Sequence, residues 1–190
     1  MNLSDKSSSI KEDKKLLTKI KQRDQDAFVK AYDLYVDQIY RFIYFKVNNQ
    51  EEAQDITSAV FLKTWNYIQE NSLKNYKTLK ALIYKIARNT IIDYYRKKSH
   101  ITITIDDQEN KIDLPDTKQD IIKQTEIFSD FKILEEKLQF LKDEYREVII
   151  LRYIDELSIN EIADIVNKSK SNIRVLTHRA LKALRELMEE

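Results

Sequence analysis

Residues 157–174 read LSINEIADIVNKSKSNIR, and this stretch predicts two short amphipathic helices joined by a tight turn. Ser158 and Glu161 have the spacing of a capping box, and Ser169 is suited to cap the second helix. Asn167 falls where the turn needs a positive φ, which asparagine tolerates better than most other residues that carry a Cβ. The pattern is typical of a helix-turn-helix, a motif that enters the major groove of DNA.

The second of these helices has two chemically different faces. Residues 168–185 contain six Lys or Arg and no Asp or Glu, although the net charge of the whole chain is only +1. Phosphate is the expected counter-charge of such a face, and a solvated helix on a plain bundle is the alternative. Helical spacing gives an apolar face of Ile173, Ala180, Leu181 and Leu184, and a cationic face of Lys170, Arg174, His178, Lys182 and Arg185.

The composition predicts an all-α protein. The 190 residues contain no Gly and a single proline, Pro115, so β-hairpins with glycine-dependent turns are poorly supported. A chain of this length can form one mid-sized domain or two small ones. Because helical periodicity occurs on both sides of a polar middle stretch, two small helical domains fit better.

The same composition excludes most enzyme classes. Phosphate-binding loops, dinucleotide fingerprints and nucleophile elbows all need glycine. The chain has no Cys, and its two histidines, His100 and His178, are far apart. We therefore expect no catalytic site, cofactor or metal. The chain has no secretory signal core and no apolar run near the roughly 20 residues of a membrane span, so we expect a cytoplasmic protein with no membrane partner.

The hydrophobic pattern divides the chain into four parts. Residues 1–13 are polar and are expected to be disordered. Residues 14–99 predict a helical domain, residues 100–130 a flexible acidic linker, and residues 131–190 a second helical domain that ends in the helix-turn-helix. The first domain is expected to contain four helices, with helical patterns at 16–20, 27–47, 51–68 and about 78–98.

The linker differs in charge from both of its neighbours. Residues 101–130 contain eight Asp or Glu against three Lys. Residues 101–105 alternate like a β-strand, but a strand this short without a partner is not stable alone, so an extended segment is expected.

A second basic patch lies at the end of the first domain. Residues 74–98 contain eight Lys or Arg against the single acid Asp93. Two basic patches on two tethered domains favour a protein that binds one nucleic acid at two places. Once one domain is bound, the tether raises the effective concentration of the other domain near the nucleic acid.

These features resemble the RNA polymerase sigma factors of the extracytoplasmic-function group, group IV of the sigma-70 family. The resemblance covers nearly the whole chain and depends on residues 52–56, 60–65 and 84–96, then on residues 146–153, the helix-turn-helix and residues 178–180. It implies a first domain like sigma region 2 and a second domain like sigma region 4. The order of the residue types at Leu176 and Thr177 is reversed from the family pattern, so no promoter sequence is carried over.

The resemblance also implies site residues in each domain. In the second domain, the reader of the −35 element would consist of Lys170, Ser171, Asn172, Arg174, His178, Arg179 and Lys182. In the first, the residues that read the −10 element and assist melting would be Asn75, Tyr76, Lys77, Arg88, Asn89, Arg96, Lys97 and Lys98. Tyr94 and Tyr95 fit either a core position or base stacking.

Contact with core polymerase is implied for the segment that precedes the −10 reader. Phe61 and Trp65 fit the core as well as the contact, and exposed polar residues around an apolar anchor are the better candidates. The implied polymerase-binding residues are Gln54, Asp55, Ser58, Phe61, Leu62 and Trp65.

The leading hypothesis is an alternative sigma factor, which is not an enzyme. It would bind bacterial core RNA polymerase, read the −35 and −10 elements of promoter DNA and assist melting at transcription initiation. The family also implies an inhibitory anti-sigma factor and a monomer when the chain is free. The alternative is an autonomous dimeric helix-turn-helix regulator, which would bind a palindromic site without polymerase.

Overall fold

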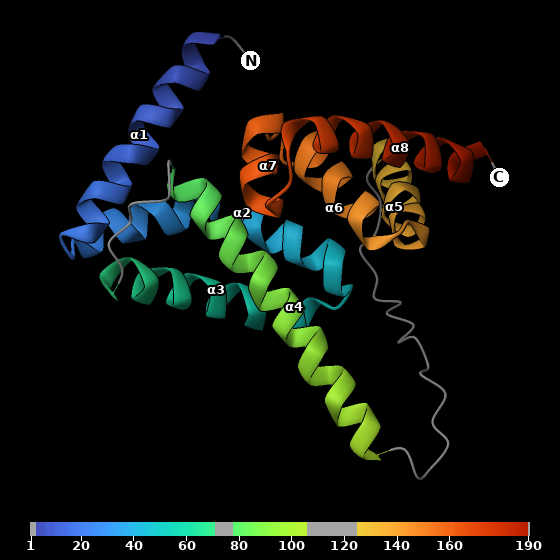
Figure 1. Cartoon of the computed structure of the whole chain (residues 1–190), viewed down its shortest axis with the longest axis horizontal. Helices are drawn as coiled ribbons and strands as arrows, with labels where there is room; N and C mark the ends of the chain where they lie inside the picture. Colours follow the sequence, from blue (N-terminus) through green and yellow to red (C-terminus); the bar gives the residue numbers. More distant parts are fainter. Residues whose placement is uncertain (1–2, 71–77, 106–124, 190) are drawn as a thin grey trace.

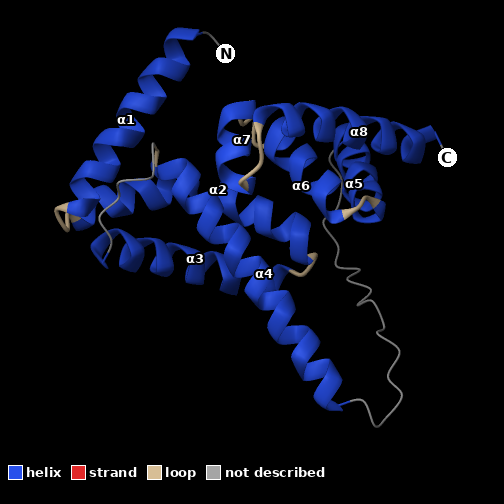
Figure 2. Cartoon of the chain, viewed as in Figure 1, coloured by secondary structure: helices blue, strands red, loops and turns tan. Residues whose placement is uncertain are grey.

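The computed structural model describes residues 3–70, 78–105 and 125–189, and these ranges contain helices and short turns without a strand (Figure 2). The all-α prediction is confirmed. Four helices come first: α1 (Leu3–Lys21), α2 (Gln25–Val47), α3 (Gln50–Glu70) and α4 (Leu79–Ile105). After the undescribed segment follow α5 (Thr125–Phe140), α6 (Asp143–Ile149), the π-helix η1 (Ile150–Ile154), α7 (Ile159–Val166) and α8 (Lys170–Glu189).

The first four helices share an apolar core. Asp24 caps α2 by accepting a hydrogen bond from the Ala27 amide, and Asn48 ends the helix in the left-handed region at φ 53°. Apolar residues then recur along α2 with helical spacing and face α3 and α4. The core includes Ala31, Ile39, Phe42, Ile43, Val60, Leu82, Ile83 and Tyr84.

Helix α1 differs from the predicted disorder of residues 1–13, because it begins at Leu3. Its Asp13 side chain is buried and accepts hydrogen bonds from the Tyr35 hydroxyl and from the amides of Leu79 and Lys80. Those two amides are at the start of α4, so Asp13 caps a helix that begins 66 residues later. Burial raises the pKa of Asp13 against the lowering effect of these hydrogen bonds.

Helix α4 also differs from the prediction at its other end. Residues 101–105 were predicted to be extended, but α4 continues through Ile105 and its last part projects beyond the other helices (Figure 1). Extending an existing helix adds one backbone hydrogen bond per residue, whereas a lone strand has no partner for its backbone groups. The predicted flexible linker therefore falls mainly on residues 106–124, outside the described residues, and helix resumes at Thr125.

The helix-turn-helix is present as predicted. Ser158 and Glu161 form the complete capping box of α7, and Asn167 ends that helix at φ 56°. The Ser169 hydroxyl then accepts a hydrogen bond from the Asn172 amide at 3.2 Å. Leu138, Ile150, Leu151, Leu157, Ile162 and Ile173 are almost fully buried beneath the motif.

The two groups of helices lie against each other in Figure 1. Helix α7 lies on the first part of α4, and α5 and η1 approach α2. Among the described residues, no helix combines the length and apolarity needed to cross a bilayer.

Candidate functional site

The cationic face of α8 is open to solvent. Ile173 and Ala180 are fully buried, and Thr177 is buried with its hydroxyl bonded to the Ile173 carbonyl. Leu181, on the predicted apolar face, is 38% exposed and lines a pocket with Leu184 at the boundary with α2. All seven predicted residues of the −35 reader are exposed on α8: Lys170, Ser171, Asn172, Arg174, His178, Arg179 and Lys182.

The predicted −10 residues divide into two sets. Asn75, Tyr76 and Lys77 lie outside the described residues, and the other five are on α4. Of these five, Arg88 is half-buried, whereas Asn89, Arg96, Lys97 and Lys98 are exposed.

Several α4 side chains already have partners within the chain. Arg96 forms an ion pair with Asp93 at 3.2 Å. Lys98 contacts Glu52 at 3.2 Å and donates to the Tyr94 hydroxyl at 2.9 Å, and that hydrogen bond raises the pKa of Lys98. Tyr95 is exposed, and its hydroxyl donates to the Lys46 carbonyl. The basic character of α4 is therefore less available than its sequence indicates.

The predicted polymerase-binding residues of α3 also separate by exposure. Gln54, Asp55 and Ser58 are exposed, and Leu62 is 63% exposed. Phe61 is buried, so it supports this surface from below and does not form it.

Aromatic rings from α2 reinforce the same region. Trp65 is half-buried, with its ring 5.0 Å from that of Phe28, and the exposed Tyr32 ring lies 4.7 Å from Phe61. Sequence reasoning missed Tyr32 and the exposed Val29, although both are apolar residues off the buried stripe of α2. That departure from the stripe is the signal that marks them.

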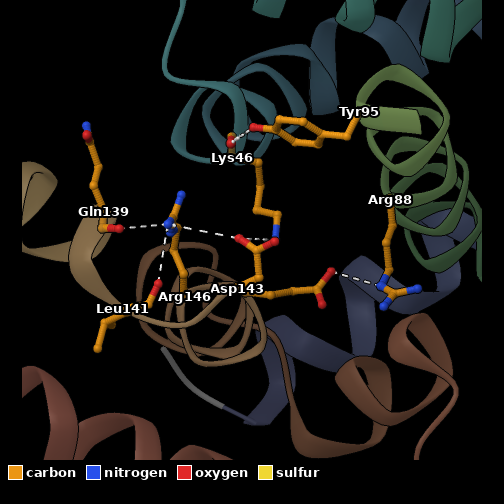
Figure 3. Close-up of polar contacts among 8 residues, drawn as sticks. Lys46, Arg88, Tyr95, Gln139, Leu141, Asp143 and Arg146 are labelled. Atoms are coloured by element: carbon orange, nitrogen blue, oxygen red, sulfur yellow. Dashed lines mark hydrogen bonds and ion pairs between the residues drawn. The ribbon is translucent and has the colours of Figure 1, made fainter. Parts of the chain in front are cut away.

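Among the described residues, three ion pairs connect the two groups of helices, and the close-up in Figure 3 shows two of them. Arg88 Nε contacts Glu147 Oε1 at 2.9 Å, and Lys46 Nζ contacts Asp143 Oδ1 at 3.7 Å. The third pair joins an Arg41 nitrogen to Asp155 Oδ1 at 3.5 Å. Apart from Arg88, sequence reasoning missed these residues, because nothing local indicates a partner so far along the chain.

Burial changes the charge properties at this boundary. The Asp155 side chain has no exposed surface, and burial raises its pKa to about 6 despite the nearby Arg41 and Lys80. Burial lowers the pKa of Lys80. Burial and a hydrogen bond to Glu135 of α5 raise the pKa of Tyr44 of α2 to about 12.

The side chains of α5 and α6 are held together independently of this boundary. Arg146 donates to the carbonyls of Gln139 and Leu141 at the end of α5 (Figure 3). Lys168, in the turn before α8, pairs with Glu144 of α6 at 2.9 Å. No group of acids and histidines with metal-binding geometry occurs among the described residues.

Comparison with known proteins identifies the family. The Sigma-70 region 2 family matches residues 25–101, and the Sigma-70 region 4 family matches residues 131–184. The ECF RNA polymerase sigma factor SigW of Bacillus subtilis (strain 168) is 31% identical over 183 residues, which are 93% of this chain and 97% of that protein. The chain belongs to the ECF RNA polymerase sigma factors.

Other relatives agree with this assignment. RNA polymerase sigma factor SigV of the same organism is 30% identical over 88% of this sigma factor and 94% of its own length. Two solved structures share the fold. CnrH, in complex with the cytosolic domain of CnrY, matches with a TM-score of 0.70 at 17% identity, covering 94% of this chain and 97% of that chain.

The second structure is the sigma factor RpoE of Bartonella quintana, in complex with the anti-sigma factor NepR. It matches with a TM-score of 0.66 at 21% identity, covering 85% of this chain and 96% of that chain. The region 2 match includes α2, α3 and most of α4, and the region 4 match includes the helix-turn-helix. This protein is therefore an alternative RNA polymerase sigma factor, and the comparisons give no support to an autonomous dimeric regulator.

Proposed function

We propose that this sigma factor uses α8 to read the −35 element and the α4 region to read the −10 element. The observation that carries the proposal is the exposure of all seven predicted cationic and polar residues on α8, within the part that matches region 4. The partners are core RNA polymerase and promoter DNA. The sigma factor supplies specificity and no catalysis, because polymerase performs the chemistry.

On α8 the proposed roles differ with position along the helix. The first part of a recognition helix contacts base edges, so Lys170 and Arg174 are the readers. An arginine can donate two hydrogen bonds to guanine, and a good bidentate contact contributes about 1–3 kcal/mol of discrimination. Arg179 and Lys182 lie farther along and hold phosphate, which positions the helix without reading sequence.

The proposed −10 reader combines the predicted loop residues with α4. Asn89 supplies an amide for an unstacked base, and the cations Arg88, Arg96, Lys97 and Lys98 supply backbone contacts. Unstacking a base costs a few kcal/mol, so opening is confined to sequences whose binding compensates for it.

The proposed polymerase contact is the exposed surface of α3 with its aromatic support. Leu62 provides an apolar anchor and Gln54, Asp55 and Ser58 a polar surround, which is the usual composition of a protein interface. Tyr32 and Val29 of α2 extend it. The sigma factor acts in the cytoplasm, is monomeric when free and has an anti-sigma factor as a further partner, since RpoE of Bartonella quintana is solved with one.

Run-off transcription with bacterial core polymerase tests the proposal, with and without the sigma factor, on candidate promoter templates. We expect initiation from a defined start only when the sigma factor is present, and about a tenfold or larger loss for Arg174→Ala. Val175→Ala is the matched control, because it shortens an exposed, uncharged neighbour on the same helix. If Arg174→Ala and Val175→Ala support equal run-off transcription, Arg174 does not read the −35 element.

A further inference from the structure

The three ion pairs between the two groups of helices share one polarity. Every cation comes from the first four helices: Arg41 and Lys46 from α2, and Arg88 from α4. Every acid comes from the region 4 side, from α6 or the end of η1: Asp143, Glu147 and Asp155. A basic surface of the first domain is thus matched by an acidic surface of the second.

Burial distinguishes these contacts from ordinary surface ion pairs, most clearly for Arg88–Glu147. The side chain of Glu147 is 8% exposed and that of Arg88 is 31% exposed. Asp155 is fully enclosed and Lys46 is largely covered, whereas their partners Arg41 and Asp143 are 39% and 75% exposed. Charges that have lost hydration depend on their partners, since removing one leaves the other uncompensated.

The apolar packing at the same boundary is incomplete. A pocket of about 120 Å³ between α4 and α6 is lined by Ile91, Ile92 and Tyr95 together with the paired charges. A larger pocket, of about 500 Å³, is lined by Arg41 of α2 together with Tyr153 and Leu181 of the second domain. Both pockets are open to solvent, so the boundary is not a continuous apolar core and has the character of a contact between domains.

We propose that the pairs Lys46–Asp143 and Arg88–Glu147 form a charge latch that keeps the free sigma factor closed. The Arg41–Asp155 pair lies at the same boundary but is not part of the latch, because burial raises the pKa of Asp155 and so disfavours its charged form. In the closed form, carboxylates bind the guanidinium and ammonium groups that phosphate can also bind. The latch therefore covers part of the basic surface around α4 and leaves the α8 face exposed. The covering of a DNA-binding surface rests on the proposed role of Arg88 in the −10 reader. The closed form of the free chain does not depend on that role.

The closed form can be measured in the free chain by energy transfer between two dyes. Because the chain has no Cys, Glu70→Cys on α3 and Glu189→Cys on α8 provide two labelling sites outside the latch. In this doubly labelled chain, the double variant Asp143→Lys with Glu147→Lys places a lysine opposite Lys46 and another opposite Arg88, so both attractions become repulsions. We expect the ratio of closed to open molecules to fall at least about tenfold, which lowers the energy transfer between the dyes.

Two further variants make the result specific. Glu136→Lys with Asp164→Lys makes the same charge change at exposed positions of the second domain and should leave transfer unchanged. Adding Lys46→Glu and Arg88→Glu to the latch variant reverses both pairs and should restore transfer. The thermal unfolding midpoint of each variant shows whether its helices remain folded.

The outcomes separate the latch from the proposed function. Unchanged transfer in a folded latch variant would overturn the latch, and so would failure of the reversed pairs to restore it. Neither experiment uses polymerase or DNA. If the latch variant opens as expected but run-off transcription does not depend on the sigma factor, the latch stands and the promoter-reading roles fail.

Discussion

Helices α8 and α4 carry the two basic surfaces of this sigma factor, and they are positioned in opposite ways. The start of α8 is fixed by neighbours in sequence: Ser158 caps the start of α7, Asn167 ends α7, and Ser169 caps α8. The start of α4 has a local cap in Thr78, whose hydroxyl accepts from the Ala81 amide, but it also depends on Asp13, 66 residues away. Farther along α4, Arg88 is bound by Glu147, 59 residues away.

This difference has a functional consequence. The cations of α8 face solvent, so the upstream reader is available in the closed form. On α4, Arg88 is paired with Glu147 of the second domain, so in the proposed roles the downstream reader is partly covered in the closed form.

The largest expected effect concerns the distant cap. Asp13→Ala removes the acceptor of two α4 amides and of the Tyr35 hydroxyl, all at a buried site. Leaving such groups unsatisfied should lower the free energy of unfolding by about 3 kcal/mol. Urea denaturation followed by circular dichroism measures this.

The control for Asp13 is another aspartate that caps a helix locally. Asp24 accepts one hydrogen bond from the Ala27 amide at 3.0 Å and is partly exposed. Asp24→Ala should cost about 1 kcal/mol. If the two variants lose equal stability, α4 is not held by α1 in the way described.

The next effect is a dependence of closure on pH through Asp155, which lies beside the latch. Asp155 faces Arg41 from α2 and Lys80 and Tyr84 from α4, and burial raises its pKa to about 6. If opening returns its pKa to the ordinary value of 3.8, the closed form binds the proton more tightly, so lowering the pH favours closure. Between about pH 7 and pH 5 the closed-to-open ratio should rise about tenfold.

Energy transfer in the doubly labelled chain measures this change. Asp155→Asn should abolish most of the pH dependence, because it removes the titrating carboxyl while keeping a similar shape. A pH response that survives in Asp155→Asn would assign the effect to another group.

A smaller effect separates phosphate contact from base reading on α8. Arg179→Ala should weaken binding by about 1 kcal/mol on every promoter and lower the slope of log affinity against log salt by about 1. Arg174→Ala should instead depend on the upstream sequence. Filter binding or anisotropy of the holoenzyme at several salt concentrations distinguishes them, and a sequence-dependent loss for Arg179→Ala would contradict its role.

The smallest effect tests the local turn. Asn167 has φ 56°, a region that costs a residue with a Cβ more than it costs glycine. Asn167→Ala should destabilise the second domain by about 1 kcal/mol, whereas Asn167→Gly should match or exceed the natural stability. Thermal unfolding of both variants compares them, and equal losses would show that the turn conformation is not limiting.

The features that could be predicted from the sequence are those fixed by local contacts, as at the start of α8, and not those fixed by distant residues, as along α4. The capping box, the turn at Asn167 and the charged face of α8 depend on residues within one or two helical turns, and all were predicted. The burial of Asp13 and the pairing of Arg88 depend on contacts that no local pattern contains. The disorder predicted for residues 3–13 was wrong for that reason.

Two other differences from the sequence predictions have related causes. Residues 101–105 alternate like a strand, but the helix before them continues because each added residue gains a backbone hydrogen bond. Leu181 has helical spacing with Ile173 and Ala180, yet it lies at the incompletely filled boundary with α2. The linker and the residues 75–77 stay predictions, because they lie mainly or wholly outside the described residues.

If the two basic helices read two different promoter elements, each helix should respond to changes in its own element alone. Run-off transcription can show this on templates in which only the upstream or only the downstream element is changed, with Arg174→Ala and Asn89→Ala. We predict that Arg174→Ala causes no further loss once the upstream element is changed, and that Asn89→Ala causes none once the downstream element is changed. If each substitution lowers transcription by the same factor on every template, whichever element is changed, the two helices do not read separate elements.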